Sequence, residues 1–407
     1  LAESPPDRAR TDTPLRVLDI TDFYSDTVSG GVKTYLHAKS AHLERLGVEH
    51  TLVVPGERDE IQALGATRVH RVRGWTLPMS RAYRVMLSVD RLRAILRAER
   101  PHIVEVGSPF LVPHLLARAL RLHPVPTVGF YHADVVRTFA EPYVPSRWAA
   151  PLRVLARMSA RRLVRRVYRR FDATVAASDS TAEDLGAMGI SGVHTVGLGV
   201  QLEIFRPYPQ AERIDWCTHG VPDGVPVAFY AGRFCAEKRL DVILQGHALL
   251  PEEERPHLVL VGGGPHRKRH EELARRREGL TVLPYMDARA TLARHYASAD
   301  FYLATGPGET FGLSIAEAMA CGLPVVAVDR AAAPDRVAGS GVGVLYEHGR
   351  PVSAAAALRR MTRRIRDGQG EALRRQARRH AEAHFDWAGT FASLLDLYRS
   401  LLPVGRR

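Results

Sequence analysis

The chain has 407 residues, of which 45% are hydrophobic and 25% are charged. That length and composition fit a globular protein with room for two domains, and they exclude a disordered chain, a collagen-like fibre and a disulfide-stapled miniprotein. Lysine and arginine together number 57 against 44 acidic residues, which gives a formal net charge of +13. Only four of these cations are lysines, Lys33, Lys39, Lys238 and Lys268, and we expect them to be more informative than the abundant arginines.

Three scattered cysteines form neither a disulfide framework nor a metal-site spacing, which indicates a reducing compartment. Residues 1–14 are polar and are expected to form a flexible tail, without the apolar core of a signal peptide. No apolar run approaches the ~20 residues that a membrane span requires. These features favour a cytoplasmic protein. The basic charge predicts no nucleic-acid partner, because no zinc-finger spacing, RNP signature or basic zipper accompanies it.

The first part of the chain alternates predicted strands and helices. Residues 15–20 are typical of a buried strand, a glycine loop follows, and the period of 32–46 predicts a helix. Further strands are expected at 50–55, 103–106, 127–131 and 174–177, and helices at 90–98, 112–122, 151–171 and 181–188. This alternation predicts a parallel sheet covered by helices, so we assign residues 15–204 to a Rossmann-like acceptor domain. Its acceptor loops are expected at 74–87 and 135–148.

Two prolines in residues 205–209 interrupt the pattern, which then begins again. Strands are predicted at 225–231, 257–261, 280–283, 301–304 and 324–328, and helices at 240–250, 267–277, 289–297 and 313–320. We therefore expect a second Rossmann-like domain over residues 205–385 and a final helix over 386–407. The fold class is α/β, with two doubly wound domains that hold a ligand in the cleft between them, at the carboxyl ends of their strands.

The most specific motif is the segment Gly308–Val326, in which Glu309 and Glu317 lie eight residues apart. Glu309 falls in a glycine-rich loop after a predicted strand, and Glu317 falls on the helix that follows. Loop amides and a helix N-terminus attract an anion, and carboxylates beside them accept hydrogen bonds from sugar or ribose hydroxyls. Further donor-binding residues are expected at Thr310, Phe311, Gly312 and Leu313.

A second motif, Ala231–Asp241, directly follows a predicted strand. Its Arg233 and Lys238 are five residues apart in one loop, so a guanidinium and an ammonium can close on the same diphosphate and neutralise its charge as it leaves. Loss of either contact should raise the barrier by about 2–4 kcal/mol. Gly232 is expected to bring the backbone close to the donor, and Asp241 to cap or orient the loop.

Three weaker motifs leave two interpretations each. Gly30 and Gly31, followed by Lys33, form a turn whose amides can close over phosphate or sugar, or a tight turn without a ligand. Gly263 and its neighbouring glycines are expected near the nucleotide, or again form only a turn. The segment 130–135 places His132 beside the transferred sugar, or makes it a structural histidine. Asp134 and Lys33 are assigned to the acceptor side.

The segment 148–170 is strongly basic, with eight arginines and no acid from Leu152 onward. Leu152, Leu155, Leu163, Val164 and Val167 form a rough apolar stripe along it. The helix can pack this stripe on the core, or it can lie on an anionic membrane surface and make the protein peripheral at the inner face of the membrane. The sequence contains no DxD pair, so no metal is expected to hold a diphosphate, and no cofactor is expected beyond the co-substrate.

Together these motifs resemble glycosyltransferase family 4, from about Leu15 to Leu402. The resemblance implies a GT-B fold whose last helix crosses back onto the first domain. It also implies diphosphate contacts from Arg233 and Lys238, a ribose contact from Glu317, sugar contacts from Glu309, and a place for His132 beside the transferred sugar. Two positions depart from the family, where Gln201 replaces a usual Asp and Arg239 replaces a frequent Gly.

The resemblance implies a retaining, metal-independent hexosyltransferase that moves a hexose from a GDP- or UDP-sugar to an acceptor hydroxyl. The acceptor would be a small molecule, a glycan or a glycolipid. The motifs at 130–135 and 101–109 most resemble the mannosyl and glycolipid-forming members. Two alternatives are a GT-B-fold sugar-nucleotide epimerase, and a basic membrane- or nucleic-acid-binding protein with a degenerate sugar site.

Overall fold

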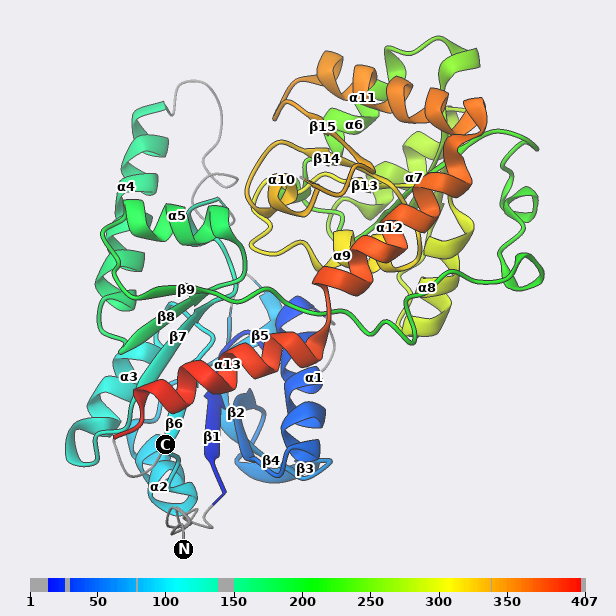
Figure 1. Ribbon diagram of the computed structural model, residues 1–407. Helices are drawn as coiled ribbons and strands as arrows, with labels where there is room; N and C mark the ends of the chain where they lie inside the picture. Colours follow the sequence, from blue (N-terminus) through cyan, green and yellow to red (C-terminus); the bar gives the residue numbers. More distant parts are fainter. Residues whose placement is uncertain (1–13, 26–29, 78–79, 138–149, 338, 404–407) are drawn as a thin grey trace, which may run out of the picture. The chain divides into compact units, whose positions relative to one another are not determined.

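The computed structural model describes residues 14–25, 30–77, 80–137, 150–337 and 339–403 (Figure 1). By their contacts these residues fall into two units. Unit 1 comprises the described residues of Leu1–Phe130, Arg170–Ala173 and Phe391–Arg407, and unit 2 comprises those of Tyr131–Arg169 and Thr174–Thr390. The tail expected over residues 1–14 lies outside the described residues except for its last position.

The first sheet has the strand order β3-β4-β2-β1-β6-β7-β8-β9, with β5 paired to β4. Its strands are β1 (Arg16–Ile20), β2 (Glu49–Gly56), β3 (Glu60–Leu64), β4 (Thr67–Leu77), β5 (Ser80–Met86), β6 (Ile103–Val106), β7 (Thr127–Tyr131), β8 (Ala173–Ala176) and β9 (Val193–Thr195). Strand β1 is parallel to both β2 and β6, with Leu18 opposite Thr51 and Val104. The order reverses at β1, so the loops that follow β1 and β6 emerge side by side.

Residues 74–77 belong to β4 and residues 80–86 to β5, so strands occupy most of the segment 74–87 that was expected to be a loop, and its acceptor role stays a prediction. In β4 the apolar side chains of Val69 and Val72 are buried, and arginines occupy positions 68, 71 and 73 around them. Arginine at so many positions hides the alternation that predicts a strand. The other expected acceptor segment, 135–148, lies largely outside the described residues.

Unit 1 contains α1 (Gly31–Arg45), α2 (Val89–Glu99), α3 (Val112–Ala119) and, from Phe391 onward, α13 (Trp387–Leu401). Helix α2 begins where the Ser88 side chain accepts a hydrogen bond from the Arg91 amide, the usual N-cap arrangement. Leu92 of α2 and Leu115 of α3 pack with Leu18 and Val104 in one buried cluster. The strands and helices predicted between residues 15 and 131 are confirmed to within a few residues.

A buried charge cluster links α13 to α1 and the first sheet. The Lys39 ammonium lies 2.7 Å from Asp19 and 3.2 Å from Glu105, and it donates to the Tyr398 hydroxyl at 2.8 Å. The Tyr398 hydroxyl in turn donates to Glu105, and His50 contacts Asp19 at 2.5 Å. Lys39 is 1% exposed. One lysine therefore holds two strands and the last helix together, which confirms the predicted return of that helix.

Unit 2 contains a six-stranded sheet in the order β12-β11-β10-β13-β14-β15. Its strands are β10 (Val227–Ala231), β11 (His257–Val261), β12 (Leu280–Leu283), β13 (Phe301–Ala304), β14 (Val325–Val328) and β15 (Gly343–Tyr346), and every pairing is parallel. Strands β11, β13 and β14 are buried along their whole length, which explains their unbroken apolar sequences. The order reverses between β10 and β13.

The helices of unit 2 are α4 (Ala150–Tyr168), α5 (Asp179–Ala187), α6 (Leu240–Ala248), α7 (Arg267–Arg276), α8 (Arg289–Ser298), α9 (Leu313–Ala320), α10 (Ala332–Val337), α11 (Pro351–Arg364) and α12 (Gly370–His384). Those predicted from the sequence are confirmed, whereas α10, α11, α12 and the strand β15 were not predicted. Over the described part of the chain, no helix is both long and apolar enough to cross a bilayer.

Helix α4 divides the expected apolar stripe in two. Val164 and Val167 are fully buried, so the C-terminal half of the helix packs on the core. Leu152 and Leu155 are 60% and 56% exposed, and Met158 on the next turn is 45% exposed. The C-terminal half of α4 therefore packs on the core, and contact of the helix with a membrane stays a prediction.

Candidate functional site

The two most specific motifs meet at the reversal point of the second sheet. The loop after β10 carries Lys238 and the loop after β13 carries Glu309, and adjacent parallel strands place such loops at the same edge. The Lys238 ammonium forms an ion pair with the Glu309 carboxylate. A cavity of about 30 Å³ surrounds the pair, lined also by Gly306, Tyr302 and Ser314. Two motifs separated by some 70 residues of sequence thus form one site.

The ion pair fixes the charge of Lys238. Burial lowers the pKa of Lys238, but Glu309 beside it more than offsets this effect, and the pKa lies above its usual range. The Thr305 hydroxyl donates to the Lys238 carbonyl and so holds the lysine backbone against the β13 loop. A permanently charged ammonium at the end of a strand is suited to a diphosphate, which must share or replace Glu309 as its partner.

The glycine run after β11 packs against the loop that carries Arg233. The Phe234 amide donates to the Gly263 carbonyl at 2.7 Å, and a Cβ on Gly262 would lie 1.9 Å from the Gly232 carbonyl oxygen. Only glycine permits this approach. Gly262 and Gly264 are therefore explained by packing between the loops, whereas Gly263 has room, because a Cβ there would lie 3.8 Å from its nearest neighbour. Arg233 is exposed.

Glu317 lies on α9 in a buried position, 9% exposed. Its carboxylate receives a hydrogen bond from the Arg289 guanidinium at 3.0 Å. Burial raises the pKa of Glu317, and Arg289 offsets part of this effect. Sequence analysis did not find Arg289, because nothing in the sequence around α8 links it to the acidic motif. A buried carboxylate oriented by an arginine can accept a hydroxyl of a ribose ring.

His132 lies beside the acidic motif within unit 2. Its backbone carbonyl accepts a hydrogen bond at 2.8 Å from the hydroxyl of Thr310, the residue after Glu309. Between Thr310 and α9, Phe311 is buried and the N-cap residue Gly312 adopts φ 81, in the left-handed region that favours glycine. The intermediate exposure of His132 leaves part of its side chain accessible. The structure thus brings His132 together with the loop of Glu309.

The two residues assigned to the acceptor side make local contacts. The buried Asp134 carboxylate accepts from the amides of Val136 and Arg137 at 3.0 Å and pairs with the Arg137 side chain at 2.9 Å, which stabilises the turn after β7. Lys33 on α1 donates to the Ser25 carbonyl at 3.1 Å. Their acceptor roles stay predictions.

Besides Asp19 and Glu105, unit 1 contains a third buried carboxyl that the sequence analysis missed. Asp22 follows β1, and it accepts hydrogen bonds from the Met86 amide at 3.2 Å and the Ser108 hydroxyl at 3.4 Å. Burial raises its pKa to about 6. Gly30 is the N-cap of α1, and Gly31 is its first residue. The position of Asp22 directly after an apolar strand was the only signal in the sequence. A carboxyl that titrates near neutral pH can take a proton from a hydroxyl.

Among the side chains that the structure describes, no group of three or more His, Cys, Asp or Glu residues is placed to hold a metal ion. Two ion pairs, Lys238 with Glu309 and Arg289 with Glu317, and the exposed Arg233 are the charged groups of the two motifs and their partner on α8. We refer to these five residues as the donor site, and their contact with a donor stays a prediction.

The fold is that of the GT-B glycosyltransferases. Sucrose-phosphate synthase from Thermosynechococcus elongatus superimposes with a TM-score of 0.76 at 19% identity, over 95% of this chain and 99% of that chain. Anabaena HepE, solved in complex with UDP-glucose, gives a TM-score of 0.72 at 17% identity, over 95% of this chain and 100% of that chain. The fold class predicted from the sequence is confirmed.

The sequence comparisons identify the family. The model described as Glycosyltransferase Family 4 matches residues 29–204, and the one described as Glycosyl transferases group 1 matches residues 225–364. A GDP-mannose-dependent alpha-(1-6)-phosphatidylinositol dimannoside mannosyltransferase of Mycobacterium tuberculosis is 32% identical over 388 residues, 94% of this chain and 95% of the relative. A GDP-mannose-dependent alpha-mannosyltransferase of Mycolicibacterium smegmatis is 31% identical over 349 residues, 82% of this chain and 84% of the relative.

The chain belongs to glycosyltransferase family 4. It is a hexosyltransferase that uses a nucleotide sugar, as the motifs of the donor site predicted. The comparisons do not favour the epimerase or the nucleic-acid-binding alternative. Its similarity to mannosyltransferases agrees with the preference drawn from the segments 101–109 and 130–135.

Proposed function

We propose that the protein is a retaining mannosyltransferase that transfers mannose from GDP-mannose to a hydroxyl of a glycolipid acceptor. The observation that supports this proposal most strongly is the 32% identity over 94% of the chain to a mannosyltransferase acting on a phosphatidylinositol dimannoside. A second relative with a GDP-mannose donor is 31% identical. In this proposal residues 15–204 form the acceptor domain and residues 205–385 the donor domain.

The donor site supplies the electrostatic part of the reaction. Arg233 and Lys238 bind the diphosphate and stabilise its charge as the glycosidic bond breaks, without a metal ion. Lys238 exchanges Glu309 for a phosphate oxygen, which frees the Glu309 carboxylate for the sugar hydroxyls. Glu317, oriented by Arg289, accepts a ribose hydroxyl.

The chemical step is a front-face substitution, in which the acceptor hydroxyl attacks from the side on which the diphosphate leaves. The leaving phosphate oxygen takes the proton of that hydroxyl, so no protein carboxylate is needed as nucleophile. His132 lies beside the loop of Glu309 and positions the sugar. Retention of the anomeric configuration follows from attack on the same face.

The exposed half of α4 is proposed to contact an anionic membrane surface, where a glycolipid acceptor resides. Leu152, Val154, Leu155 and Met158 are between 45% and 60% exposed on this helix, and the helix carries no acidic residue. Apolar side chains that enter the acyl boundary, flanked by arginines that face anionic head groups, favour such binding. The segment before Ala150 lies outside the described residues.

The donor assignment is tested with purified protein, phosphatidylinositol mannosides as acceptor, and either GDP-mannose or UDP-glucose as donor. We expect mannose transfer with GDP-mannose and an axial product linkage by NMR. Lys238→Ala should lose about 10²–10³-fold in kcat/KM. Lys268→Ala, which removes an exposed lysine far from this loop in sequence, should retain wild-type activity. Preference for UDP-glucose, or equal activity of the two variants, would contradict the proposal.

The membrane contact is tested by sedimentation with phosphatidylinositol-containing vesicles. Leu155→Asp should lower vesicle binding by about tenfold, because burial of one leucine contributes about 1.5–3 kcal/mol. Leu249→Asp places the same change at a similarly exposed leucine of unit 2, and it should bind vesicles like the wild type. Equal binding by wild type and Leu155→Asp would refute the assignment of α4.

A further inference from the structure

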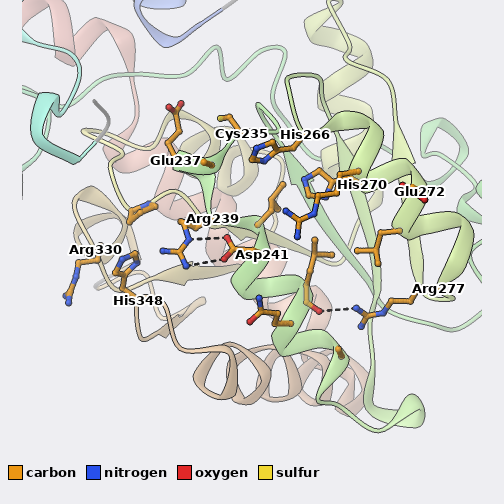
Figure 2. A pocket seen from close by; sticks show the side chains of 18 of the residues that line it. Cys235, Glu237, Arg239, Asp241, His266, His270, Glu272, Arg277, Arg330 and His348 are labelled. Atoms are coloured by element: carbon orange, nitrogen blue, oxygen red, sulfur yellow. Dashed lines mark hydrogen bonds and ion pairs between the residues drawn. The ribbon is translucent and has the colours of Figure 1, made fainter. Parts of the chain in front are cut away.

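A groove with a volume of about 1180 Å³ runs along α6 and α7 in unit 2 (Figure 2). Most of its walls come from the loop Cys235–Arg239 and from these two helices, and further lining residues are Arg137, Arg157, Pro307, Arg330 and His348. It shares no lining residue with the cavity around Lys238 and Glu309, although the same loop contributes to both. The groove is therefore separate from the cavity around Lys238 and Glu309.

The groove is lined by more arginines than carboxylates, seven against three. Four of the arginines are paired with carboxylates, Arg239 with Asp241, Arg276 with Glu272, Arg137 with Asp134 and Asp184, and Arg330 with Asp329. Arg269 is exposed and has no carboxylate partner among the ion pairs of the described residues. The lining therefore carries an excess of positive charge that an anionic ligand would balance.

Arg277 adds to this excess from a half-buried position. Its guanidinium donates to the Leu244 carbonyl at 3.0 Å and contacts His247 at 2.5 Å, and no ion pair with a carboxylate is found for it in the described chain. Burial and the neighbouring Arg255 lower the pKa of Arg277. A guanidinium that is partly desolvated without a counter-charge is stabilised by an anion in the groove.

His270 provides an independent observation that points to a ligand in the groove. It is only 6% exposed, it lines the groove, and its Nδ1 has no hydrogen-bond partner among the described residues. Its ring packs edge-on against Phe234, with centroids 5.1 Å apart, and lies close to His266 (Figure 2). Buried polar nitrogens in proteins are almost always hydrogen-bonded, so this nitrogen is suited to a polar group inside the groove.

The backbone of Arg239 gives a third observation. It adopts φ 48 and ψ 36, a left-handed conformation that is costly for a residue with a Cβ and that glycine would adopt freely. The side chain is oriented by Asp241, with Nε and Nη2 each 3.1 Å from a carboxylate oxygen. An arginine kept in a strained conformation and held in place by a carboxylate is expected where its side chain has a use.

We propose that this groove binds a small molecule that carries more than one phosphate group, with Arg269, Arg277 and Arg239 on the phosphates and His270 Nδ1 hydrogen-bonded to the ligand. Guanidinium groups match phosphate geometry with two parallel hydrogen bonds. The cations are spread along a groove far larger than a single phosphate, which favours several phosphates over one. The described lining contains no Phe, Tyr or Trp side chain on which a sugar ring or a base could stack.

The test is calorimetric titration of the full chain with tripolyphosphate, in the wild type and in Lys238→Ala. The groove site should persist in Lys238→Ala, because Lys238 does not line it. Arg269→Gln should weaken tripolyphosphate binding by about tenfold, the loss of one charge-assisted contact. Lys268→Gln changes the adjacent exposed residue of α7, which does not line the groove, and should weaken it less than twofold.

Three results would overturn the proposal. Binding abolished by Lys238→Ala would place the phosphate at the donor site alone. Equal weakening by Arg269→Gln and Lys268→Gln would mean that only diffuse surface charge is involved. If tripolyphosphate does not bind, while Arg269→Gln lowers binding to phosphatidylinositol vesicles, the phosphate belongs to a lipid head group and not to a small molecule. None of these results depends on which sugar the enzyme transfers.

Discussion

Replacement of Lys39 by methionine removes the ammonium that lies between two buried carboxylates while keeping the length of the side chain. Asp19 and Glu105 are each 2% exposed and lie 2.7 Å and 3.2 Å from the ammonium. Removal of one partner from a buried ion pair costs about 3–5 kcal/mol. The lower end of that range applies here, because His50 still contacts Asp19 and Glu105 can take up a proton. We therefore expect a loss of about 3 kcal/mol.

Hydrogen–deuterium exchange reports this loss in unit 1 directly, without assuming that the whole chain unfolds in one step. Amides of β1 and α1 in Lys39→Met should exchange about a hundredfold faster than in the wild type. Lys33→Met, on the same helix, removes one hydrogen bond to the Ser25 carbonyl and one cation–π contact with Tyr24, and it should change exchange less than about fivefold. Exchange in Lys39→Met within about threefold of the wild type would refute the structural role of this cluster.

Three further predictions concern single groups. Burial raises the pKa of Glu105 to about 7 from its usual 4.5. The protonated carboxyl therefore stabilises the folded state at low pH, and this stabilisation is lost as the pH rises. In urea titrations, the unfolding free energy of the wild type relative to Glu105→Gln should fall between about pH 5 and pH 7. Gly262→Ala should destabilise unit 2 by about 1–3 kcal/mol, whereas Gly263→Ala should leave its thermal unfolding unchanged. Glu309→Gln should tighten GDP binding a few-fold in calorimetry, because Lys238 loses a competing partner, while transfer slows.

The order of strands and helices could be predicted from the sequence because the central strands are buried and therefore apolar, and helices separate them. The apolar runs of β10, β11 and β13 are visible without any tertiary information. The strands β4 and β5 were missed because arginines interrupt the alternation of polar and apolar residues, and β3 was missed because it is short and has no fully buried position. The helices α10 to α12 were not predicted, because the sequence around them contains no motif of specific spacing.

The donor site could be predicted as a set of residues but not as a set of contacts. Lys238 and Glu309 were assigned to one ligand, yet their ion pair depends on the reversal of strand order between β10 and β13, which no local pattern specifies. Arg289 was missed for the same reason, since its partner Glu317 lies 28 residues away. Asp22 was missed because it is a single carboxyl with no second functional residue at a characteristic distance in the sequence.

The partners of Lys39 and Lys238 distinguish a lysine with a structural role from a lysine that can bind a ligand. Lys39 is enclosed by two carboxylates and a tyrosine hydroxyl, so all of its hydrogen-bonding capacity is used inside the protein. Lys238 has one carboxylate partner and is 25% exposed, so a phosphate can approach it. A phosphate oxygen that replaces Glu309 keeps an anion beside the ammonium, so the exchange leaves no unpaired charge on Lys238. A lysine with one exchangeable internal partner is therefore ready to bind a diphosphate, whereas a lysine with saturated partners is not.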